Sequence, residues 1–177
     1  TPQHLKFKMK IYKDVLTGDE LASDSYPIKE IDDIVYEVEA KMVTKVQGDY
    51  GIAANTDEEG GGDAGVDSSV ESVINVVDAH RLMETSYDKK SYMLHIKGYM
   101  QQLVAYLKEN NPSRVEAFQK GAQAFVKKLL AGFAEFRFFQ GESMDIEKGM
   151  VLLMFYREDG ITPVFYVWKD GVNEEKF

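Results

Sequence analysis

The chain has 177 residues, an apolar content of 44% and a formal net charge of −9. This length and composition suit one globular domain, and the acidic balance disfavours sequence-independent nucleic-acid binding, which needs clustered Lys and Arg. The absence of cysteine excludes disulfides, thiolate nucleophiles and thiolate zinc sites, and no apolar run approaches the roughly 18–20 residues of a membrane span. We also see no signal peptide before the first strand and expect a cytoplasmic protein.

The N-terminal part predicts two strands. Residues 1–8 do not fit the pattern that follows, and we expect the natural chain to start at Met9, with the preceding residues added during cloning. Met9–Asp14 alternates weakly before the turn Thr17-Gly18 and predicts a strand. Ile34–Val43 predicts a longer strand because apolar and charged side chains alternate along it. Its faces would carry Tyr36, Val38, Ala40 and Met42 on one side and Glu37, Glu39 and Lys41 on the other.

The segment 48–69 is expected to be a long mobile acidic loop within a single domain at 9–177. It is rich in glycine and acids and almost lacks large apolar side chains, so it cannot bury enough surface to offset its ordering entropy. From Gln47 to Asp78 there are eight acidic and no basic side chains. Beyond the loop, Val70–Met83 predicts a strand because an apolar run occupies its centre.

The stretch Asp88–Phe136 predicts two amphipathic helices that fold back on each other. Apolar side chains recur every three or four residues, which is the period of a helix with one apolar stripe. The stripes are Tyr92, Ile96, Tyr99, Leu103 and Leu107 in the first helix, and Phe118, Ala122, Phe125, Leu129 and Phe133 in the second. Pro112 would end the first helix, and Ser113 with Glu116 fits a capping box at the start of the second. The stretch holds eight basic and four acidic side chains, a local charge of +4.

Three C-terminal apolar stretches predict strands. They are Arg137–Gln140, Met150–Tyr156 and Pro163–Trp168, and glycines between them mark turns. Strands on both sides of a helical hairpin indicate an α+β fold.

The motifs of common catalytic sites are absent or incomplete. Neither glycine-rich phosphate-binding pattern occurs, and His80 and His95 lie apart, so a structural role for each is the simpler interpretation. The run from Gly141 to Asp145 approaches the nucleophile elbow G-x-S-x-G, but Asp145 replaces the second glycine, which that tight turn requires. We therefore interpret this run as a plain turn and expect no enzyme.

Two charged clusters are candidate binding sites. Acidic side chains crowd one N-terminal turn, and oxygen-rich clusters can hold calcium, although no EF-hand pattern is present. The candidate calcium ligands are Asp14, Asp19, Glu20 and Asp24. The basic cluster on the predicted hairpin consists of Lys89, Lys90, Lys97, Lys120, Lys127 and Lys128. The alternatives are a solvated acidic patch for the first cluster and a surface that only keeps the helices soluble for the second.

Several stretches combine into a family pattern. They are Ile11-Tyr12-Lys13-Asp14 with Asp19-Glu20 and Ser23-Asp24; Lys41-Met42-Val43; Asp88-Lys89-Lys90-Ser91-Tyr92 with Ile96-Lys97-Gly98-Tyr99-Met100; Phe138–Asp145; and Tyr156–Pro163. Together they resemble the translationally controlled tumour protein family, in order along essentially all of residues 9–177. One departure matters. The loop of the family usually reads Asn-Pro-Ser-Ala-Glu, whereas Asp57 stands at the serine that is phosphorylated in some relatives, so that regulatory site is not carried over.

The resemblance implies a fold and a set of partners. The fold would be a tent-like mixed β-sheet core with a projecting helical hairpin at about 88–136 and a long mobile loop. It is similar to nucleotide-free Rab chaperones, which hold a zinc ion through cysteines; this chain has no cysteine, so no zinc is expected. Family members are cytosolic proteins without established catalysis that bind calcium weakly, bind tubulin and translation elongation factors, and regulate small GTPases and growth.

Two hypotheses for the function follow. In the first, the chain is a monomeric regulator that engages a small GTPase, through guanine nucleotide exchange, or a translation elongation factor. Here Glu20 aligns with a glutamate implicated in GTPase engagement in relatives. In the second, the chain binds tubulin and calcium, and its basic hairpin contacts microtubules. Neither hypothesis requires a cofactor beyond weakly bound calcium. The resemblance also implies release from cells without a signal peptide, as in some relatives.

Overall fold

The computed structural model describes residues 9–46 and 70–177. The predictions for residues 1–8 and for the acidic loop 48–69 lie outside the described residues. The helices are α3 (Asn75–His80), α4 (Lys89–Asn110) and α5 (Val115–Ala131), with the short 3-10 turns η2 (Pro112–Arg114), η3 (Phe133–Glu135) and η4 (Lys169–Gly171). The strands are β1 (Lys10–Asp14), β2 (Glu20–Ser23), β3 (Ile28–Ile31), β4 (Val35–Glu39), β5 (Met42–Val46), β6 (Val70–Ile74), β7 (Met83–Thr85), β8 (Arg137–Gln140), β9 (Leu152–Tyr156), β10 (Pro163–Trp168) and β11 (Val172–Lys176).

These strands form two sheets and a separate ribbon. One sheet has the order β11-β1-β2, the second has the order β3-β4-β10-β9-β8-β7, and β5 pairs with β6 alone. Every strand pair among the described residues is antiparallel, a detail in which the core differs from the mixed sheet that we expected. The α+β class is confirmed, and β8 and β10 have the predicted bounds.

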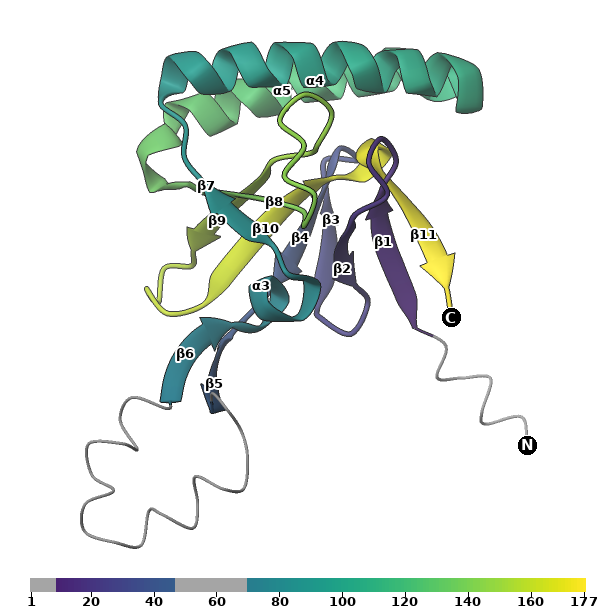
Figure 1. The fold of residues 1–177 in the computed structure, drawn as a ribbon. Coiled ribbons are helices and arrows are strands. Elements are labelled where there is room, and N and C mark those ends of the chain that lie inside the picture. Colours follow the sequence, from purple (N-terminus) through teal and green to yellow (C-terminus); the bar gives the residue numbers. More distant parts are fainter. Residues whose placement is uncertain (1–8, 47–69) are drawn as a thin grey trace, which may run out of the picture.

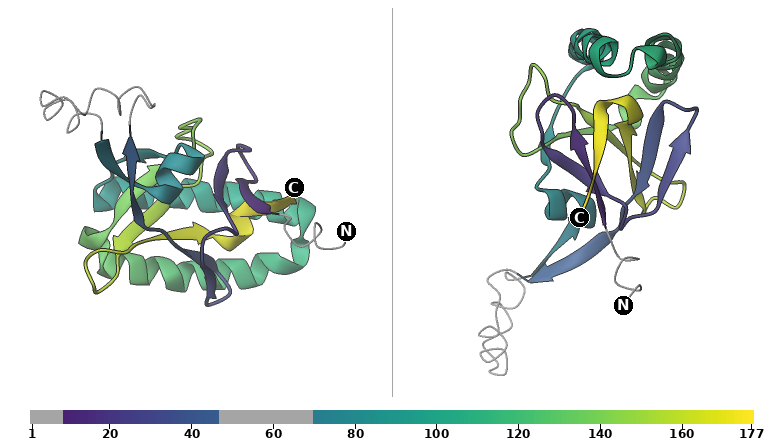
Figure 2. Two further views of the ribbon diagram at one scale, coloured as in Figure 1. Left: turned by 90° about the horizontal axis from the view of Figure 1, so that it is seen from below. Right: turned by 90° about the vertical axis from the view of Figure 1, so that its right-hand side faces the viewer.

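The helical hairpin lies across one end of both sheets, which splay apart beneath it like the sides of a tent (Figure 1). Seen end-on, α4 and α5 lie side by side in one layer, and the β5–β6 ribbon projects from the opposite end of the molecule (Figure 2). The core therefore fills the space between the two sheets and the inner face of the hairpin.

The predicted stripes form the inner face of the hairpin. All five stripe residues of α4 are buried, and so are four of the five in the second helix, whereas Phe133 is half-buried within η3. Phe125 shows how the helix meets the sheet, because its ring lies 5.1 Å from the Tyr166 ring and 5.8 Å from the Trp168 ring, centroid to centroid. Each large apolar side chain buried in this way contributes roughly 1.5–3 kcal/mol to stability.

The predicted capping box at the start of the second helix is wrong. Ser113 lies inside η2, where its hydroxyl donates to Asn111 Oδ1 at 3.1 Å, and α5 begins without a side-chain cap. The 3-10 turn delays the start of α5 by two residues and so separates Ser113 from the N–H groups that it would cap. A capping box occurs at α4 instead, where Asp88 Oδ1 accepts from Ser91 N at 2.7 Å and Ser91 Oγ accepts from Asp88 N at 3.0 Å.

Two predicted strands are interrupted. The stretch Ile34–Val43 divides into β4 and β5, and Val70–Met83 divides into β6, α3 and β7. Asn75 lies at the break in the second stretch and contacts the break in the first. Its side-chain Oδ1 accepts from Lys41 N at 3.0 Å and from Val76 N at 2.8 Å, so it links the two segments where the β5–β6 ribbon meets α3. Met42, expected on the same strand face as Tyr36, Val38 and Ala40, is 41% exposed because it lies on the ribbon beyond this break.

Three strands, β2, β3 and β11, were not predicted from the sequence. β3 pairs with β4, and β11 pairs with β1 although only Val172 among its residues is apolar. The pairing of β11 with β1 brings the last residues of the chain beside the first described strand, and Phe177 N donates to Met9 O at 2.9 Å. Polar edge strands of this kind are held by backbone hydrogen bonds rather than by buried side chains.

Candidate functional site

A small polar recess of about 210 Å³ forms where three segments meet. The β1–β2 turn supplies one wall, the end of α3 supplies a second, and the segment that follows β8 supplies the third. The lining residues are Lys13, Gly18, Asp19, Glu20, Ala79, His80, Arg81 and Glu142. The site therefore brings together two of the predicted acidic residues, Asp19 and Glu20, with the nearby Lys13. His80 and Arg81 come from a part of the chain about 60 residues away.

The β1–β2 turn is held by the carboxylate of Asp14, which is buried. Asp14 Oδ1 accepts from Leu16 N at 2.8 Å, and Oδ2 accepts from Met150 N at 2.9 Å. Burial raises the pKa of Asp14, whereas these backbone hydrogen bonds act in the opposite direction. Gly18 completes the turn with a φ of 84°, a conformation that side-chain-bearing residues rarely adopt.

Asp19 connects this turn to the segment that follows β8. Asp19 Oδ2 accepts from the Ser143 hydroxyl at 2.6 Å and from the Ser143 N–H at 3.3 Å. A Cβ on Gly141 would lie only 2.5 Å from Asp19 Cβ, so this close approach requires glycine. The Gly-Glu-Ser-Met segment is thus the plain turn that we predicted, and its serine is a structural donor.

Glu20 presents its carboxylate at the edge of the recess. Its side chain is 50% exposed, and Oε1 lies 3.3 Å from Nδ1 of the buried His80. His80 Nε2 lies 3.2 Å from the hydroxyl of Tyr26, so both ring nitrogens have partners. Burial lowers the pKa of His80, and the Glu20 carboxylate partly opposes that shift. A neutral His80 that donates from Nδ1 to Glu20 and accepts from Tyr26 satisfies all three groups.

The four candidate calcium ligands do not converge. Asp14 is used by backbone donors, Asp19 by Ser143 and Glu20 by His80, as described above. Asp24 follows the opposite end of β2, where its Oδ1 accepts from Lys10 N at 3.1 Å. Among residues 9–46 and 70–177, no group of three or more His, Cys, Asp or Glu side chains is arranged to hold a metal ion. The calcium site stays a prediction.

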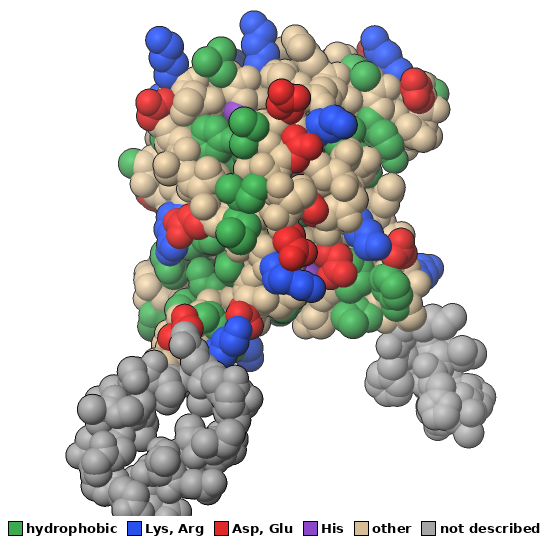
Figure 3. Space-filling view, in the orientation of Figure 1, with side chains coloured by type: hydrophobic (Ala, Val, Ile, Leu, Met, Phe, Trp, Pro, Cys, Tyr) green, Lys and Arg blue, Asp and Glu red, His purple; other side chains and the backbone are tan. Residues whose placement is uncertain are grey.

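The six candidate lysines of the hairpin are all exposed. Lys128 Nζ lies 3.3 Å from Asp32 and 5.6 Å from the centre of the Phe125 ring. Figure 3 shows basic side chains standing out from the edge of the molecule that the hairpin forms. The hairpin also carries an apolar groove on its outer side, described below, which our sequence analysis missed. Its signal was a second set of apolar residues beside the stripes, such as Met100, Val104 and Val126.

Comparison with known proteins identifies the family. Residues 9–173 match the family model described as translationally controlled tumour protein. The chain is 53% identical over 170 residues to the translationally-controlled tumor protein homolog of Schizosaccharomyces pombe, covering 96% of this chain and 100% of that protein. The chain belongs to the translationally controlled tumour protein family. A further family member, from Yarrowia lipolytica, is 50% identical over 168 residues, which cover 95% of this chain and 99% of that protein.

Solved structures of the family share the fold. The chain resembles Translationally Controlled Tumor-associated Protein p23fyp from Schizosaccharomyces pombe with a TM-score of 0.79 and 49% identity, covering 95% of this chain and 99% of that one. It resembles the translationally-controlled tumor protein of Caenorhabditis elegans with a TM-score of 0.71 and 37% identity, over 95% of this chain and 98% of that one. The family is not a known enzyme class. No helix in the described part of the chain is both long and apolar enough to cross a membrane.

Proposed function

We propose that this member of the family is a non-enzymatic regulatory protein that engages a small GTPase or a translation elongation factor through the surface around Glu20. The observation that carries the proposal is the Glu20 carboxylate, which is half exposed at the edge of the recess while His80 restrains it from below. A restrained, accessible carboxylate loses little side-chain entropy when it binds a cationic partner group.

The proposed chemistry is competition for phosphate-binding groups. Small GTPases hold the nucleotide phosphates with a lysine and with backbone N–H groups, all of which attract anions. A carboxylate directed at these groups would weaken nucleotide binding, which is the basis of nucleotide exchange. Arg81 and Glu142 on the rim, 3.6 Å apart, would then contact polar groups around the nucleotide site of the GTPase.

Nucleotide release tests this proposal. The assay uses a panel of purified small GTPases and elongation factors loaded with a fluorescent guanine nucleotide. We expect wild type to accelerate release from at least one of them, and Glu20→Gln to reduce that effect by at least about tenfold because the charge that competes with phosphate is lost. Glu116→Gln removes the same charge from an exposed site on α5 and should behave as wild type. Equal activity of the two variants, or no effect of wild type on any factor, would refute the proposal.

A second candidate function is binding of an acidic partner, with tubulin the one that the resemblance favours. The supporting observation is that the six candidate lysines all stand in solvent on one hairpin of an otherwise acidic protein. Such a cluster produces a local positive potential that attracts acidic surfaces, and the attraction weakens as salt shortens the screening length to about 8 Å at physiological ionic strength.

Microtubule co-sedimentation at two salt concentrations tests the second candidate. Reversing Lys90, Lys97 and Lys127 to Glu should abolish pelleting and leave the melting temperature almost unchanged, because exposed charges contribute little to stability. The matched control reverses Lys29, Lys41 and Lys176, which are also exposed but lie outside the hairpin. If both triple variants pellet like wild type, the lysines serve solubility alone.

The remaining parts of the proposal concern location and calcium. We place the activity in the cytoplasm, where small GTPases and elongation factors act. A chain without cysteine has no disulfides, so the reducing conditions there do not affect its stability. Calcium would bind weakly, through carboxylates at the β1–β2 turn, as a modulator rather than as a required cofactor. We propose that the chain acts as a monomer, and the family resemblance also supports release from cells.

A further inference from the structure

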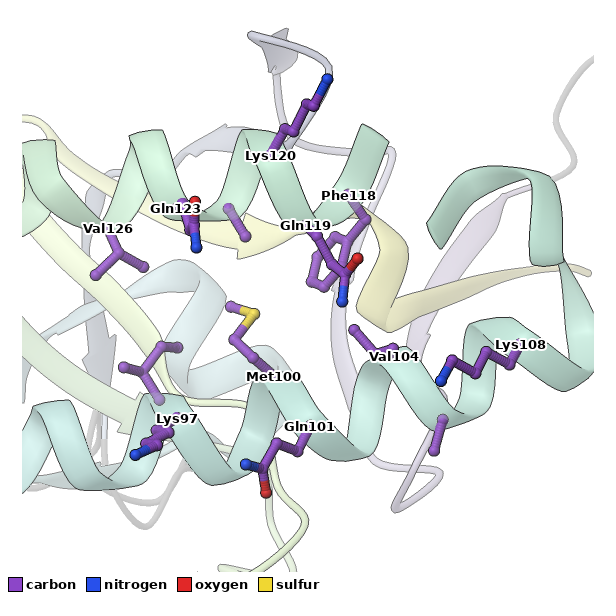
Figure 4. A pocket seen from close by; sticks show the side chains of 13 residues that line it. Lys97, Met100, Gln101, Val104, Lys108, Phe118, Gln119, Lys120, Gln123 and Val126 are labelled. Carbon is purple, nitrogen blue, oxygen red and sulfur yellow. The ribbon is translucent and has the colours of Figure 1, made fainter. Parts of the chain in front are cut away.

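A groove of about 810 Å³ runs between α4 and α5. Its lining includes exposed residues such as Lys97, Gln101 and Gln123, so it opens to solvent on the side opposite the buried stripes that pack on the sheets. Its floor is apolar and comes from both helices. Ile96 and Phe118 are buried at the bottom, while the floor residues Met100, Val104 and Val126 remain half-buried. Figure 4 shows Met100, Val104 and Val126 directed into the space between the helices. The stripes of the hairpin pack on the sheets, so this second apolar face is left without a partner from the described part of the chain.

The margin of this groove is basic. Lys97 and Lys108 border it on α4, and Lys120 borders it on α5, with glutamines between them. No acidic side chain is among the lining residues, although Glu109 and Glu116 belong to the same two helices. Lys97, Lys108 and Lys120 form no ion pair with any residue in the described ranges. Their charges are therefore available to a partner on both sides of an apolar channel.

We propose that this groove docks an amphipathic helix of a partner protein whose apolar stripe is flanked by Asp and Glu. The lining of α4 extends from Ile96 to Lys108, which corresponds to a length of about 18 Å and matches roughly three turns of a docked helix. Apolar side chains spaced three and four residues apart would contact the floor, and the flanking acids would pair with the marginal lysines. Met100 suits this role because its flexible side chain adapts to differently shaped partners.

Charge and shape favour this occupant over two others. A second copy of the chain would bring basic margins against basic margins, and like charges across an interface oppose association. A flat anionic membrane would meet the lysines but would not fill the channel between the helices, where Met100, Val104 and Val126 are only half-buried. A helix can enter the channel and satisfy floor and margin together. The inference does not rest on the Glu20 site, and it requires occupation of the groove rather than attraction to the lysines alone.

The test uses isotope-labelled protein and a panel of synthetic peptides of about five turns. Each peptide carries Leu, Met or Phe at spacings of three and four with Glu on both flanks, and its control carries Lys in place of Glu. We expect saturable chemical-shift changes confined to groove residues of α4 and α5. Ala105→Glu, on the exposed part of the lining, should weaken binding at least about tenfold by repelling the acidic peptide. Ala124→Glu is the matched control, because Ala124 is an exposed alanine of α5 outside the groove, and it should bind within about twofold of wild type.

Four outcomes would overturn the proposal. They are no shift with any peptide at millimolar concentration, equal weakening by the two alanine variants, equal binding of the Glu and Lys peptides, and shifts that lie outside the groove. Self-association that Ala105→Glu abolishes would assign the groove to a second copy instead, and wild-type binding to anionic vesicles that Ala105→Glu abolishes would assign it to membranes. Loss of peptide binding in Ala105→Glu combined with normal nucleotide release would show that the groove and the Glu20 site act separately.

Discussion

Arg114 and Asp170 join the turn of the helical hairpin to η4, which follows β10, by two parallel hydrogen bonds. Arg114 Nε donates to Asp170 Oδ1 at 2.8 Å and Nη2 donates to Oδ2 at 3.0 Å, with side-chain exposures of 15% and 7%. Arg114 also donates to the carboxylate of Asp33 in the β3–β4 turn. Lys169 of η4 donates to the same carboxylate. Lys169 and then Arg114 lower the pKa of Asp33 to about 2. One arginine thus fixes the hairpin to the β3–β4 turn of the six-stranded sheet and to η4, which connects that sheet to β11.

Removing this arginine should destabilise the protein strongly. Arg114→Ala leaves the buried Asp170 carboxylate without its partner, and we expect a loss of about 3–5 kcal/mol in the free energy of unfolding. Arg114→Lys keeps the charge but cannot form the parallel pair, so it should also lose stability, although less. Urea unfolding measures both values. Arg81→Ala, which breaks an exposed pair with Glu142, is the control and should change stability by less than about 1 kcal/mol.

Two histidines with lowered pKa values should make stability fall in mild acid. Burial lowers the pKa of His80 and of His95 below the ordinary value of 6.5. The unfolded chain therefore binds more protons than the folded chain between the lowered pKa and 6.5, and the linkage relation makes stability decrease as pH falls through that window. The stabilising contribution is fully present above 6.5. Urea unfolding at about pH 7.5 and about pH 5.5 should give a lower free energy at the acidic pH.

His95→Asn should reduce this pH dependence. His95 lies half-buried against the Tyr99 ring, with centroids 6.1 Å apart, and its Nε2 has no hydrogen-bond partner within the described structure. The variant removes one group that must be deprotonated on folding, so the difference between the two pH values should shrink even if the variant is less stable overall. The same difference in variant and wild type would contradict the assignment.

Two glycine-to-alanine substitutions should change stability in opposite directions. Gly98 lies inside α4 with nothing within 4 Å of a Cβ, so Gly98→Ala should stabilise the protein by about 0.5–1 kcal/mol through reduced unfolded-state entropy. Gly141→Ala would place its Cβ 2.5 Å from Asp19 Oδ2 and force the two turns apart, at a cost of about 1–3 kcal/mol. Equilibrium unfolding of the two variants side by side measures both effects, and a destabilised Gly98→Ala would contradict the first.

Calcium titration should reveal weak binding if the β1–β2 turn is a site. We expect a dissociation constant on the order of 10⁻⁴–10⁻³ M, because the candidate carboxylates already have protein partners and do not form a cage. Asp19→Asn and Glu20→Gln should each reduce the chemical-shift response. Asp14→Asn should act mainly on stability, since the Asp14 carboxylate accepts backbone N–H groups from two segments. Shifts confined to other parts of the chain would move the site there.

The sequence by itself determined the parts of this protein that depend on local periodicity. The hairpin stripes were predictable because residues three or four positions apart lie on the same face of a helix. Leu103 is therefore buried together with its neighbours one turn away. β8 and β10 were predictable because they are short apolar runs between turns. The Gly-Glu-Ser-Met turn was predictable because Asp145 stands where a nucleophile elbow would require a second glycine. In each case the deciding information lies within a few residues along the chain.

Only the tertiary structure decided the features that depend on residues far apart in sequence. Asn75 accepts a hydrogen bond from Lys41, 34 residues away, at the break between β4 and β5. The buried Asp14 carboxylate accepts one from Met150 N, 136 residues away, and is therefore not available to a ligand. The groove depends likewise on two helices whose second apolar faces meet without filling the space between them. Periodicity indicates that a side chain is buried or exposed, but it does not say which distant backbone group or helix lies opposite. That is why the sequence located the acidic and basic clusters, whereas packing decided which of their members can face a partner.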